Sequence, residues 1–314
     1  MKKIALFIVG IVLIIVGIAG LILPVLPGWA LIFQGLYLIT PRLATRLQKR
    51  IYRKLLKKEV FYFDEWRRYG IDAGFTTKNF RLFMKKTDEL LDAANQEMFT
   101  QLFWKNRMAG ARHRRLSRGF VVLNQVHEDT VAVLEDADTY KSGFHHLLRA
   151  DGVITNIRRL TLLVMTADCL SVYFIVADKK SPRRSPSRWV GLAHAGWRGT
   201  QKGIAVKTFR LLLEKSGVAP AHVRIIFGPS IGADHYKVGQ EFREYFPATS
   251  LAEKDNKLYF DLIKENERQL VEAGAIHDNI SDQGICTMCE ADSFHSFRRD
   301  GDTSGRMVSF ITKL

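Results

Sequence analysis

The feature that most constrains this chain is an uncharged stretch that runs from residue 4 to residue 41. Its first part, IALFIVGIVLIIVGIAGLIL, matches the roughly 20 apolar residues that an α-helix needs to cross a bilayer. A second apolar run, ALIFQGLYLIT, follows the segment PVLPGW, whose two prolines and glycine break a continuous helix. The sequence therefore predicts a transmembrane helix that either returns as a hairpin or is followed by a re-entrant segment.

Positive charge flanks both ends of this stretch. Lys2 and Lys3 precede it, and eight further Lys or Arg residues lie between residues 42 and 58. Cytoplasmic flanks of membrane segments carry an excess of Lys and Arg, which places both ends in the cytoplasm. A transmembrane hairpin over residues 1–41 satisfies this condition. The second apolar run is short for a full span, so a single crossing stays open as the alternative.

The hairpin places the rest of the chain at the cell membrane, on its cytoplasmic side. We expect reporters fused before Ile4 and after Leu314 to be active only in the cytoplasm, because both basic flanks resist translocation. A C-terminal reporter that is active only outside the cell would replace the hairpin by the single crossing.

The net charge of +15 is concentrated at the N-terminus. Residues 1–58 contain ten Lys or Arg and no Asp or Glu, which leaves about +5 for the rest of the chain. Anionic lipid headgroups explain this basic segment better than nucleic acid does, and we expect no nucleic-acid partner. Residues 42–59 are predicted to form a basic amphipathic linker, on the membrane surface or in solvent, with apolar positions at Leu43, Leu47, Ile51, Leu55 and Leu56.

Residues 60–314 have the pattern of a folded domain. Short β-rich runs predict strands at 120–127, 131–135, 161–166, 172–178, 189–194, 223–228 and 306–311. Amphipathic patterns predict helices at 201–215, 238–246 and 261–273. This mixture is typical of a layered α/β or α+β domain. Three cysteines are too few for a disulfide framework in 314 residues, which favours a reducing compartment.

Three ligands for a soft metal ion lie where predicted strands end. His127 closes FVVLNQVH, Cys169 follows TLLVMT, and His194 closes WVGLAH. Two imidazoles and a thiolate form a zinc ligand set that leaves a fourth position for water or substrate, as in catalytic sites. We expect about one zinc ion per chain. Spacings of 42 and 25 residues are weak evidence by themselves, since each residue taken alone is more often structural.

The motifs around these residues are more specific. LNQVH, ADGVIT, TADCLSV, AHAGWRGT, FGPSIG and CTMCEADSFHSFRRDGDTSGR occur in this order. Together they resemble the laccase-domain family of bacterial proteins, also described as purine nucleoside phosphorylases and as peptidoglycan-editing factors, over residues 69–314. The N-terminal segment resembles small bacterial membrane modules with a Pro-Gly-Trp turn.

The family resemblance implies a layered α/β fold, an α/β/α-type sandwich with a mixed sheet, and a metal held by His127, Cys169 and His194. It implies phosphorolysis of adenosine, inosine and S-methyl-5′-thioadenosine, with adenosine deamination as a further activity. Purine nucleoside and phosphate are then the partners. Two alternatives stay open: a membrane-tethered hydrolase that edits peptidoglycan precursors, and a copper-dependent polyphenol oxidase. Copper is possible, but a multicopper centre needs more His ligands than this set provides.

Phosphate binding is assigned from the HAGWRGT and SFRRDG motifs. Arg198 is a candidate to hold phosphate, together with the backbone N–H groups of Gly199 and Thr200 at the start of a predicted helix. Arg298 is a further candidate for substrate binding. A surface salt bridge is the structural alternative for Arg198, and closure of the C-terminal strand is the alternative for Arg298.

Two polar residues beside the ligands are candidates for catalysis. Asp168 precedes Cys169 and is predicted to orient an imidazole or to act as a general base, with helix capping or a buried hydrogen bond as the alternatives. Gln125, in the LNQVH motif, is similarly placed beside His127.

The chain departs from the family pattern at two motifs that bear on the pocket. Ser171 replaces the proline usual after ADC, and SIGADH, residues 230–235, lacks the cysteines often found there. Cys286 and Cys289 form a C-x-x-C pair that could bind metal or act in redox exchange, although the absence of a second pair nearby in the sequence favours a packed turn.

Overall fold

The computed structural model describes residues 59–80, 84, 89, 92–93, 95–97, 99–101, 119–140, 142–147, 149–177 and 189–314. The chain divides into two compact units, Met1–Lys58 and Glu59–Leu314. The predicted transmembrane hairpin and all of the basic linker except Glu59 lie outside the described residues. Within the described ranges, no helix is long and apolar enough to cross a membrane.

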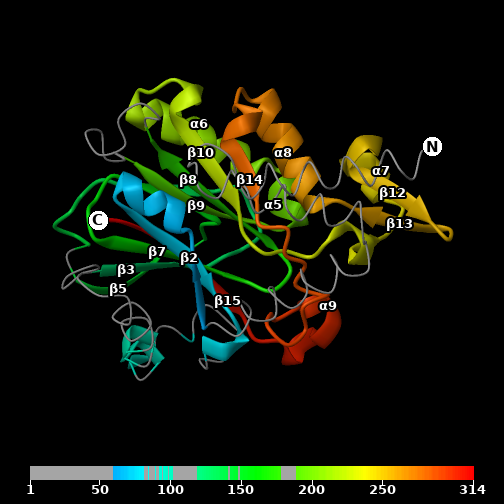
Figure 1. Ribbon diagram of the computed structural model, residues 1–314, viewed down its shortest axis with the longest axis horizontal. Helices are drawn as coiled ribbons and strands as arrows, with labels where there is room; N and C mark the ends of the chain where they lie inside the picture. The colour runs from blue at the N-terminus through cyan, green and yellow to red at the C-terminus, as the bar shows by residue number, and fades with distance from the viewer. Residues whose placement is uncertain are drawn as a thin grey trace, which may run out of the picture. The chain divides into compact units, whose positions relative to one another are not determined.

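Two mixed sheets form the body of the second unit, and each has six strands among the described residues. The first has the order β1-β2-β15-β7-β3-β5, with strands at Val60–Tyr62, Ile71–Thr76, Met307–Lys313, Leu160–Thr166, Gly119–Leu123 and Gly143–Leu147. The second has the order β14-β10-β8-β9-β6-β4, with strands at Ile280–Asp282, Val223–Phe227, Leu170–Val176, Val190–Ala195, Gly152–Thr155 and Val131–Leu134. Figure 1 shows the strands of both sheets within one body.

The two sheets pack against each other through the longest apolar strands. Every residue of β7, β8 and β9 is buried, as expected for continuous apolar runs that are covered on both faces. A hydrogen bond also joins the layers: the Tyr173 hydroxyl donates to the Gly74 carbonyl of β2 over 2.8 Å. The ring of Phe63 meets the Tyr173 ring edge to face, with centroids 4.9 Å apart.

Helices cover the outer face of the second sheet. Helix α6, Ile204–Ser216, buries Ile204, Phe209 and Leu212, whose spacing puts them on one face, and it ends at Gly217 with φ 66°. The buried face of α6 and that of α8, Leu262–Glu272, pack in one apolar cluster, which includes Phe174 of β8. The shorter helices are α5 at Trp197–Gln201, α7 at Phe242–Tyr245 and α9 at Phe297–Asp300, and a small sheet of order β11-β13-β12 comprises Lys237–Val238, Lys257–Phe260 and Leu251–Lys254.

The mixed α/β class is confirmed, but the predicted α/β/α-type sandwich around one mixed sheet requires correction. The second sheet has α6 and α8 on one face and the first sheet on the other, so two mixed sheets are stacked. An apolar strand has the same sequence pattern whether a helix or another sheet covers it, because both kinds of layer supply an apolar surface.

All of the predicted strands and helices occur, with shifted bounds. The predicted strand 120–127 is shorter: β3 ends at Leu123, and His127 lies in the loop beyond it. The predicted helix 238–246 is reduced to α7, Phe242–Tyr245. The predicted helix 201–215 is divided between α5 and α6 by Gly203, which has φ 76°. The prediction overlooked the shorter strands, among them β6, which directly follows Asp151.

Candidate metal centre and active site

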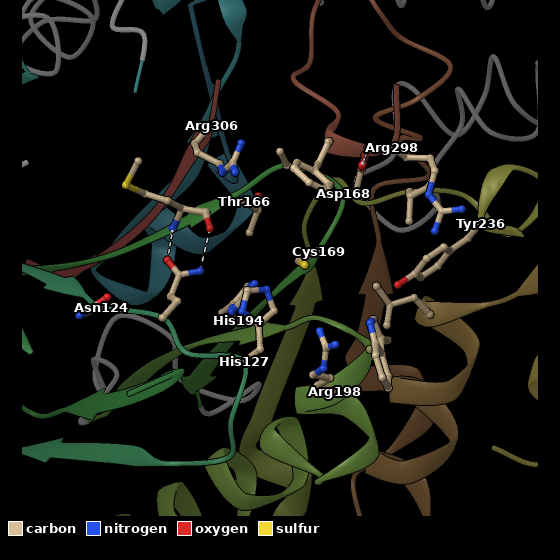
Figure 2. Close-up of a pocket in the computed structure, with 17 residues that line it drawn as sticks. Asn124, His127, Thr166, Asp168, Cys169, His194, Arg198, Tyr236, Arg298 and Arg306 are labelled. Carbon is tan, nitrogen blue, oxygen red and sulfur yellow. Dashed lines mark hydrogen bonds between the residues drawn. The ribbon is translucent and has the colours of Figure 1, made fainter. Parts of the chain in front are cut away.

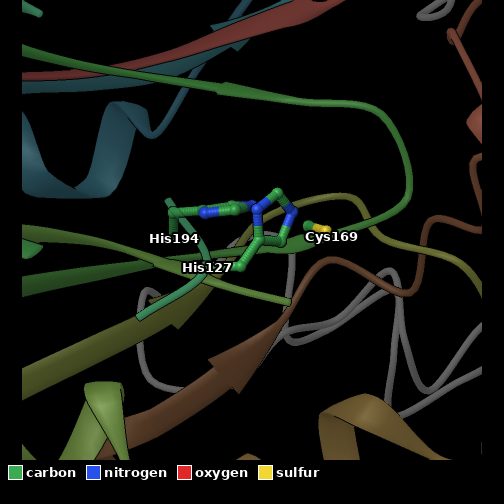
Figure 3. A group of neighbouring side chains, drawn as sticks. All are labelled: His127, Cys169 and His194. Carbon is green, nitrogen blue, oxygen red and sulfur yellow. The ribbon is translucent and has the colours of Figure 1, made fainter. Parts of the chain in front are cut away.

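Strand pairing brings the three predicted ligands together. In the antiparallel pair of β8 and β9, Leu170 lies opposite Ala195, so Cys169 comes to the end of the strand that carries His194. Cys169 follows the turn by which the chain passes from β7 in one sheet to β8 in the other. The ligand atoms of His127, Cys169 and His194 all lie within 4.8 Å of one another, and Figure 3 shows them converging on one point. The two imidazole rings meet edge to face, with centroids 4.7 Å apart.

Gly196 leaves room for this cluster. A Cβ atom at that position would lie 2.9 Å from Cys169 Sγ and 3.1 Å from His127 Cδ2. Contacts below about 3.4 Å between carbon and these atoms are repulsive, so any other residue would displace a ligand. The first glycine of the AHAGWRGT motif is therefore required by the ligands on either side of it.

Asp151, which sequence reasoning missed, holds two ligands in place. Its Oδ1 atom accepts hydrogen bonds from His194 Nδ1 over 2.8 Å and from the His127 backbone N–H over 3.0 Å. Its Oδ2 atom accepts from the backbone N–H groups of Val126 and Glu128, at 3.1 and 2.8 Å. These bonds hold His127 at an unusual φ of 60°. Asp151 lies in ADGVIT, one of the family motifs, but no local pattern showed that it meets both histidines.

Charge in the cluster favours metal ligation. Burial raises the pKa of the Cys169 thiol, but the positive charge of His194 and hydrogen bonds from both imidazoles outweigh it and lower the pKa to about 6. Burial lowers the pKa of His194, but the Cys169 thiolate and the Asp151 carboxylate outweigh it and raise the pKa to about 9. Hydrogen bonds to Asp151 outweigh its burial and lower its pKa, so the carboxylate is an acceptor and His194 Nδ1 must donate. This arrangement leaves His194 Nε2 for a metal ion, which binds in exchange for a proton.

The cluster opens into a cavity of about 610 Å³, within the range of small-molecule sites. Figure 2 shows the ligands at its centre, with Arg306 on one side and Arg298 and Tyr236 on the other. The wall combines three arginines with aromatic and apolar side chains. It is formed by Asn124, Gln125, His127, Met165, Thr166, Ala167, Asp168, Cys169, His194, Trp197, Arg198, Ile231, Tyr236, Leu262, Phe297, Arg298 and Arg306.

Two predicted phosphate ligands, Arg198 and Arg298, line this cavity. The guanidinium of Arg198 lies 4.4 Å from the Trp197 ring centroid, and no described residue forms a salt bridge with it. Arg298 is anchored by a hydrogen bond of 2.6 Å to the Lys237 carbonyl and lies 5.1 Å from the Tyr236 ring centroid. Both cations are therefore held by aromatic or backbone groups, which leaves their charge uncompensated.

Gly199 and Thr200 do not line the cavity, contrary to the predicted phosphate cradle. The Thr200 backbone N–H donates to the Gly196 carbonyl over 2.8 Å, so helix α5 already uses it. The Thr200 side chain is fully buried and accepts a hydrogen bond of 3.0 Å from Asn266 of α8. These contacts assign Thr200 to the packing of α5 on α8.

Asp168 and Gln125 line the cavity and are fixed by hydrogen bonds to its walls. Asp168, at φ 85°, accepts from the Thr287 hydroxyl and from the Arg298 backbone N–H, both over 2.6 Å. The imidazole that Asp168 was predicted to orient is instead bonded to Asp151. The Gln125 amide donates to the Met165 carbonyl and accepts from the Met165 N–H, at 2.7 and 2.8 Å.

Known proteins resemble this arrangement over most of the chain. Residues 100–313 match a family model described as "Multi-copper polyphenol oxidoreductase laccase". The chain belongs to this laccase-domain family. Residues 3–54, which precede the laccase domain, match a second model, described as "Putative transmembrane protein (PGPGW)".

Relatives of the laccase domain include enzymes named for nucleoside chemistry. Purine nucleoside phosphorylase YlmD of Bacillus subtilis is 32% identical over 251 residues, which cover 76% of this chain and 87% of the relative. Adenosine deaminase RL5, from an unknown prokaryotic organism, is 30% identical over 205 residues, 61% of this chain and 74% of the relative. The crystal structure of hypothetical protein YfiH from Bacillus licheniformis matches with a TM-score of 0.65 and 29% identity, over 82% of this chain and 97% of that one.

The residues of this laccase domain fit the metal that its family implies. The ligand atoms of two imidazoles and one cysteine lie within 4.8 Å of one another. The Asp151 carboxylate fixes the orientation of the His194 imidazole, and Gly196 leaves room for the cluster. Arg306 also lines the cavity, and sequence reasoning missed it. It belongs to the GDTSGR end of the last motif, but nothing in that motif indicated that its side chain faces wall residues from other segments.

Proposed function

We propose that the laccase domain is a metal-dependent purine nucleoside phosphorylase that acts on adenosine, inosine and S-methyl-5′-thioadenosine and also deaminates adenosine. One observation carries this proposal. Three ligands for a soft metal ion line the same cavity as three arginines whose positive charge is not fully balanced by acidic neighbours. Phosphorolysis requires a site for a phosphate anion, and deamination requires Lewis-acid chemistry. The names of the relatives from Bacillus subtilis and the unknown prokaryote support both activities.

The arginines supply the anion site. Arg198 lies in α5, whereas Arg298 and Arg306 belong to the last motif, and Figure 2 shows the three arginines on different sides of the cavity. A planar guanidinium forms two parallel hydrogen bonds to a phosphate, which fixes the direction of the attacking oxygen. We assign Arg198 the main contact, because among the described residues its guanidinium forms no hydrogen bond within the protein, whereas those of Arg298 and Arg306 donate to backbone carbonyls.

Aromatic and hydroxyl groups are suited to the nucleoside. Trp197, Tyr236 and Phe297 line the cavity and offer flat apolar surfaces for a purine ring. The Thr166 hydroxyl is buried and has no hydrogen-bond partner among the described residues, so it is available to a substrate. Asp168 and Gln125 act as positioning residues, since their polar atoms hold Arg298 and Met165.

Zinc is the proposed metal, held by His127, Cys169 and His194. When bound there, zinc supplies the Lewis acid that deamination at C6 of adenine requires. Within the described cavity lining, the histidines are His127 and His194, fewer than a multicopper centre needs, so copper-dependent oxidation of phenols is less well supported.

The N-terminal unit is proposed to tether the enzyme to the cytoplasmic face of the cell membrane. The uncharged stretch from residue 4 to residue 41, its two basic flanks and the match of residues 3–54 support a transmembrane hairpin. The described residues to which the chemistry is assigned all lie within residues 60–314, where activity is expected to reside.

Product analysis of the full-length protein in detergent tests this function. With inosine we expect hypoxanthine and ribose 1-phosphate only when phosphate is present, and with adenosine we expect inosine as well. Hypoxanthine release in the absence of phosphate would mean hydrolysis in place of phosphorolysis. A screen in which muramoyl-peptides react and nucleosides do not would instead establish the editing hydrolase.

A further inference from the structure

A second group of soft ligands lies outside the cavity. Cys286 and Cys289, the C-x-x-C pair, are joined by His235, which lies in the connection between β10 and β11. Their ligand atoms all lie within 4.8 Å of one another, as in the first cluster. None of the three residues lines the active-site cavity. The C-x-x-C pair by itself favoured a packed turn. His235, which adds a third ligand and changes this interpretation, comes from a different segment.

The backbone prepares these ligands. Ser230 and Cys286 form a parallel bridge, and the Thr287 N–H donates to the Ser230 carbonyl over 2.9 Å, so the two segments are held side by side. Cys286 Sγ accepts hydrogen bonds from the backbone N–H groups of Gly232 and Cys289, at 3.3 and 3.4 Å. These two contacts fix the position of the Cys286 sulfur beside the other two ligand side chains.

Close packing at Gly232 serves the same arrangement. A Cβ atom there would lie 3.2 Å from Cys286 Sγ and 3.3 Å from Cys286 Cβ, closer than ordinary van der Waals contact. Glycine lets the segment that carries His235 approach the sulfur. Two segments thus meet with a space between their soft ligands and with backbone donors directed at one of them.

We propose that His235, Cys286 and Cys289 bind a second soft divalent cation, zinc. Tetrahedral ligands at about 2.3 Å from zinc lie about 3.7 Å apart, so the present separations need to close by about 1 Å at most. His235 and Cys289 are exposed, which leaves their side chains free to make this adjustment. A tetrahedral zinc ion held by these three ligands would take water as its fourth ligand.

The second zinc ion would be structural and would hold two walls of the cavity together. The segment with His235 carries the wall residues Ile231 and Tyr236, and the segment with Cys286 leads to Phe297 and Arg298. Thr287, which follows Cys286, donates the hydrogen bond of 2.6 Å to Asp168. A metal cross-link between these segments removes conformational freedom from the wall in the absence of substrate.

Metal counting on the full-length protein, purified in detergent under reducing conditions, tests this proposal. Elemental analysis should find about two zinc ions per chain in the wild type, about one in Cys289→Ser, about one in His127→Ala and none in the combined variant. A wild type with only one zinc ion, which is lost in His127→Ala, overturns the proposal. Two zinc ions retained in Cys289→Ser would overturn it as well.

Two further measurements identify the ligands. His235→Asn should lose one zinc ion, whereas His222→Asn, at an exposed histidine outside both clusters, should lose none. Cobalt(II) added to metal-free His127→Ala should give thiolate-to-metal charge-transfer absorption that Cys289→Ser abolishes. Thiol titration tests the alternative that the C-x-x-C pair acts in redox exchange. A disulfide between Cys286 and Cys289, together with one zinc ion per chain, would refute the second site. These counts do not depend on which reaction the cavity catalyses.

Discussion

His127→Ala should abolish both phosphorolysis of inosine and deamination of adenosine, with kcat/KM at least about 100-fold lower for each. The reason is shared: the two reactions use one cavity, and His127 is one of only three protein ligands proposed for its metal ion. The same preparation should contain one metal equivalent fewer than the wild type. Steady-state kinetics with each substrate and elemental analysis of each preparation measure these effects.

A matched control separates ligand loss from unfolding. His222→Ala changes an exposed histidine that does not line the cavity, so both activities and the metal content should stay at wild-type values. Undiminished metal content in His127→Ala would remove His127 from the ligand set. Loss of metal with deamination intact would show that the deamination needs no metal ion at this position.

Arg198→Ala should impair phosphorolysis more than deamination, because only phosphorolysis must bind phosphate. Losing a hydrogen-bonded charge costs about 1.5–3 kcal/mol, which lowers kcat/KM for phosphate roughly 10- to 150-fold. Deamination of adenosine should change little by comparison. Arg198→Lys should recover part of the loss, since lysine restores the charge without the two-pronged guanidinium. Initial rates at varied phosphate and at varied adenosine give the two values.

The arginine test also has a control and a contrary outcome. Arg210→Ala removes an exposed arginine from helix α6 and should leave both reactions unchanged. Equal losses of both reactions in Arg198→Ala would assign the arginine to the fold or to the nucleoside site that both reactions share. The stacking of its guanidinium on Trp197 makes that outcome physically reasonable, so the comparison is informative.

Much of the candidate site was visible in short motifs. His127, Cys169, His194 and Arg198 each lie at or just beyond the end of a strongly apolar run, and such runs fix strand ends to within a few residues. Local patterning also predicted β7, β8 and β9, because their apolar runs are long and uninterrupted. At each of these positions, the residues adjacent in sequence were enough to make the prediction.

The positions that sequence reasoning missed depend on contacts between distant segments. Asp151 becomes a partner of His194 through the pairing of β6 with β9, and His235 joins Cys286 because the backbone bridge at Ser230 brings the two loops together. Thr200 looked like a phosphate ligand in its motif, but the packing of α5 on α8 turns it inward.

Sequence by itself therefore determined the long apolar strands, three side chains that can hold a metal ion and an arginine that lines the cavity, because hydrophobic period and strand ends are local properties. Tertiary structure alone decided that two sheets stack, that Asp151 orients the ligands, and that His235 completes a second cluster with Cys286 and Cys289. These outcomes depend on strand order and register, which link residues far apart in the chain and leave no periodic signal in either segment.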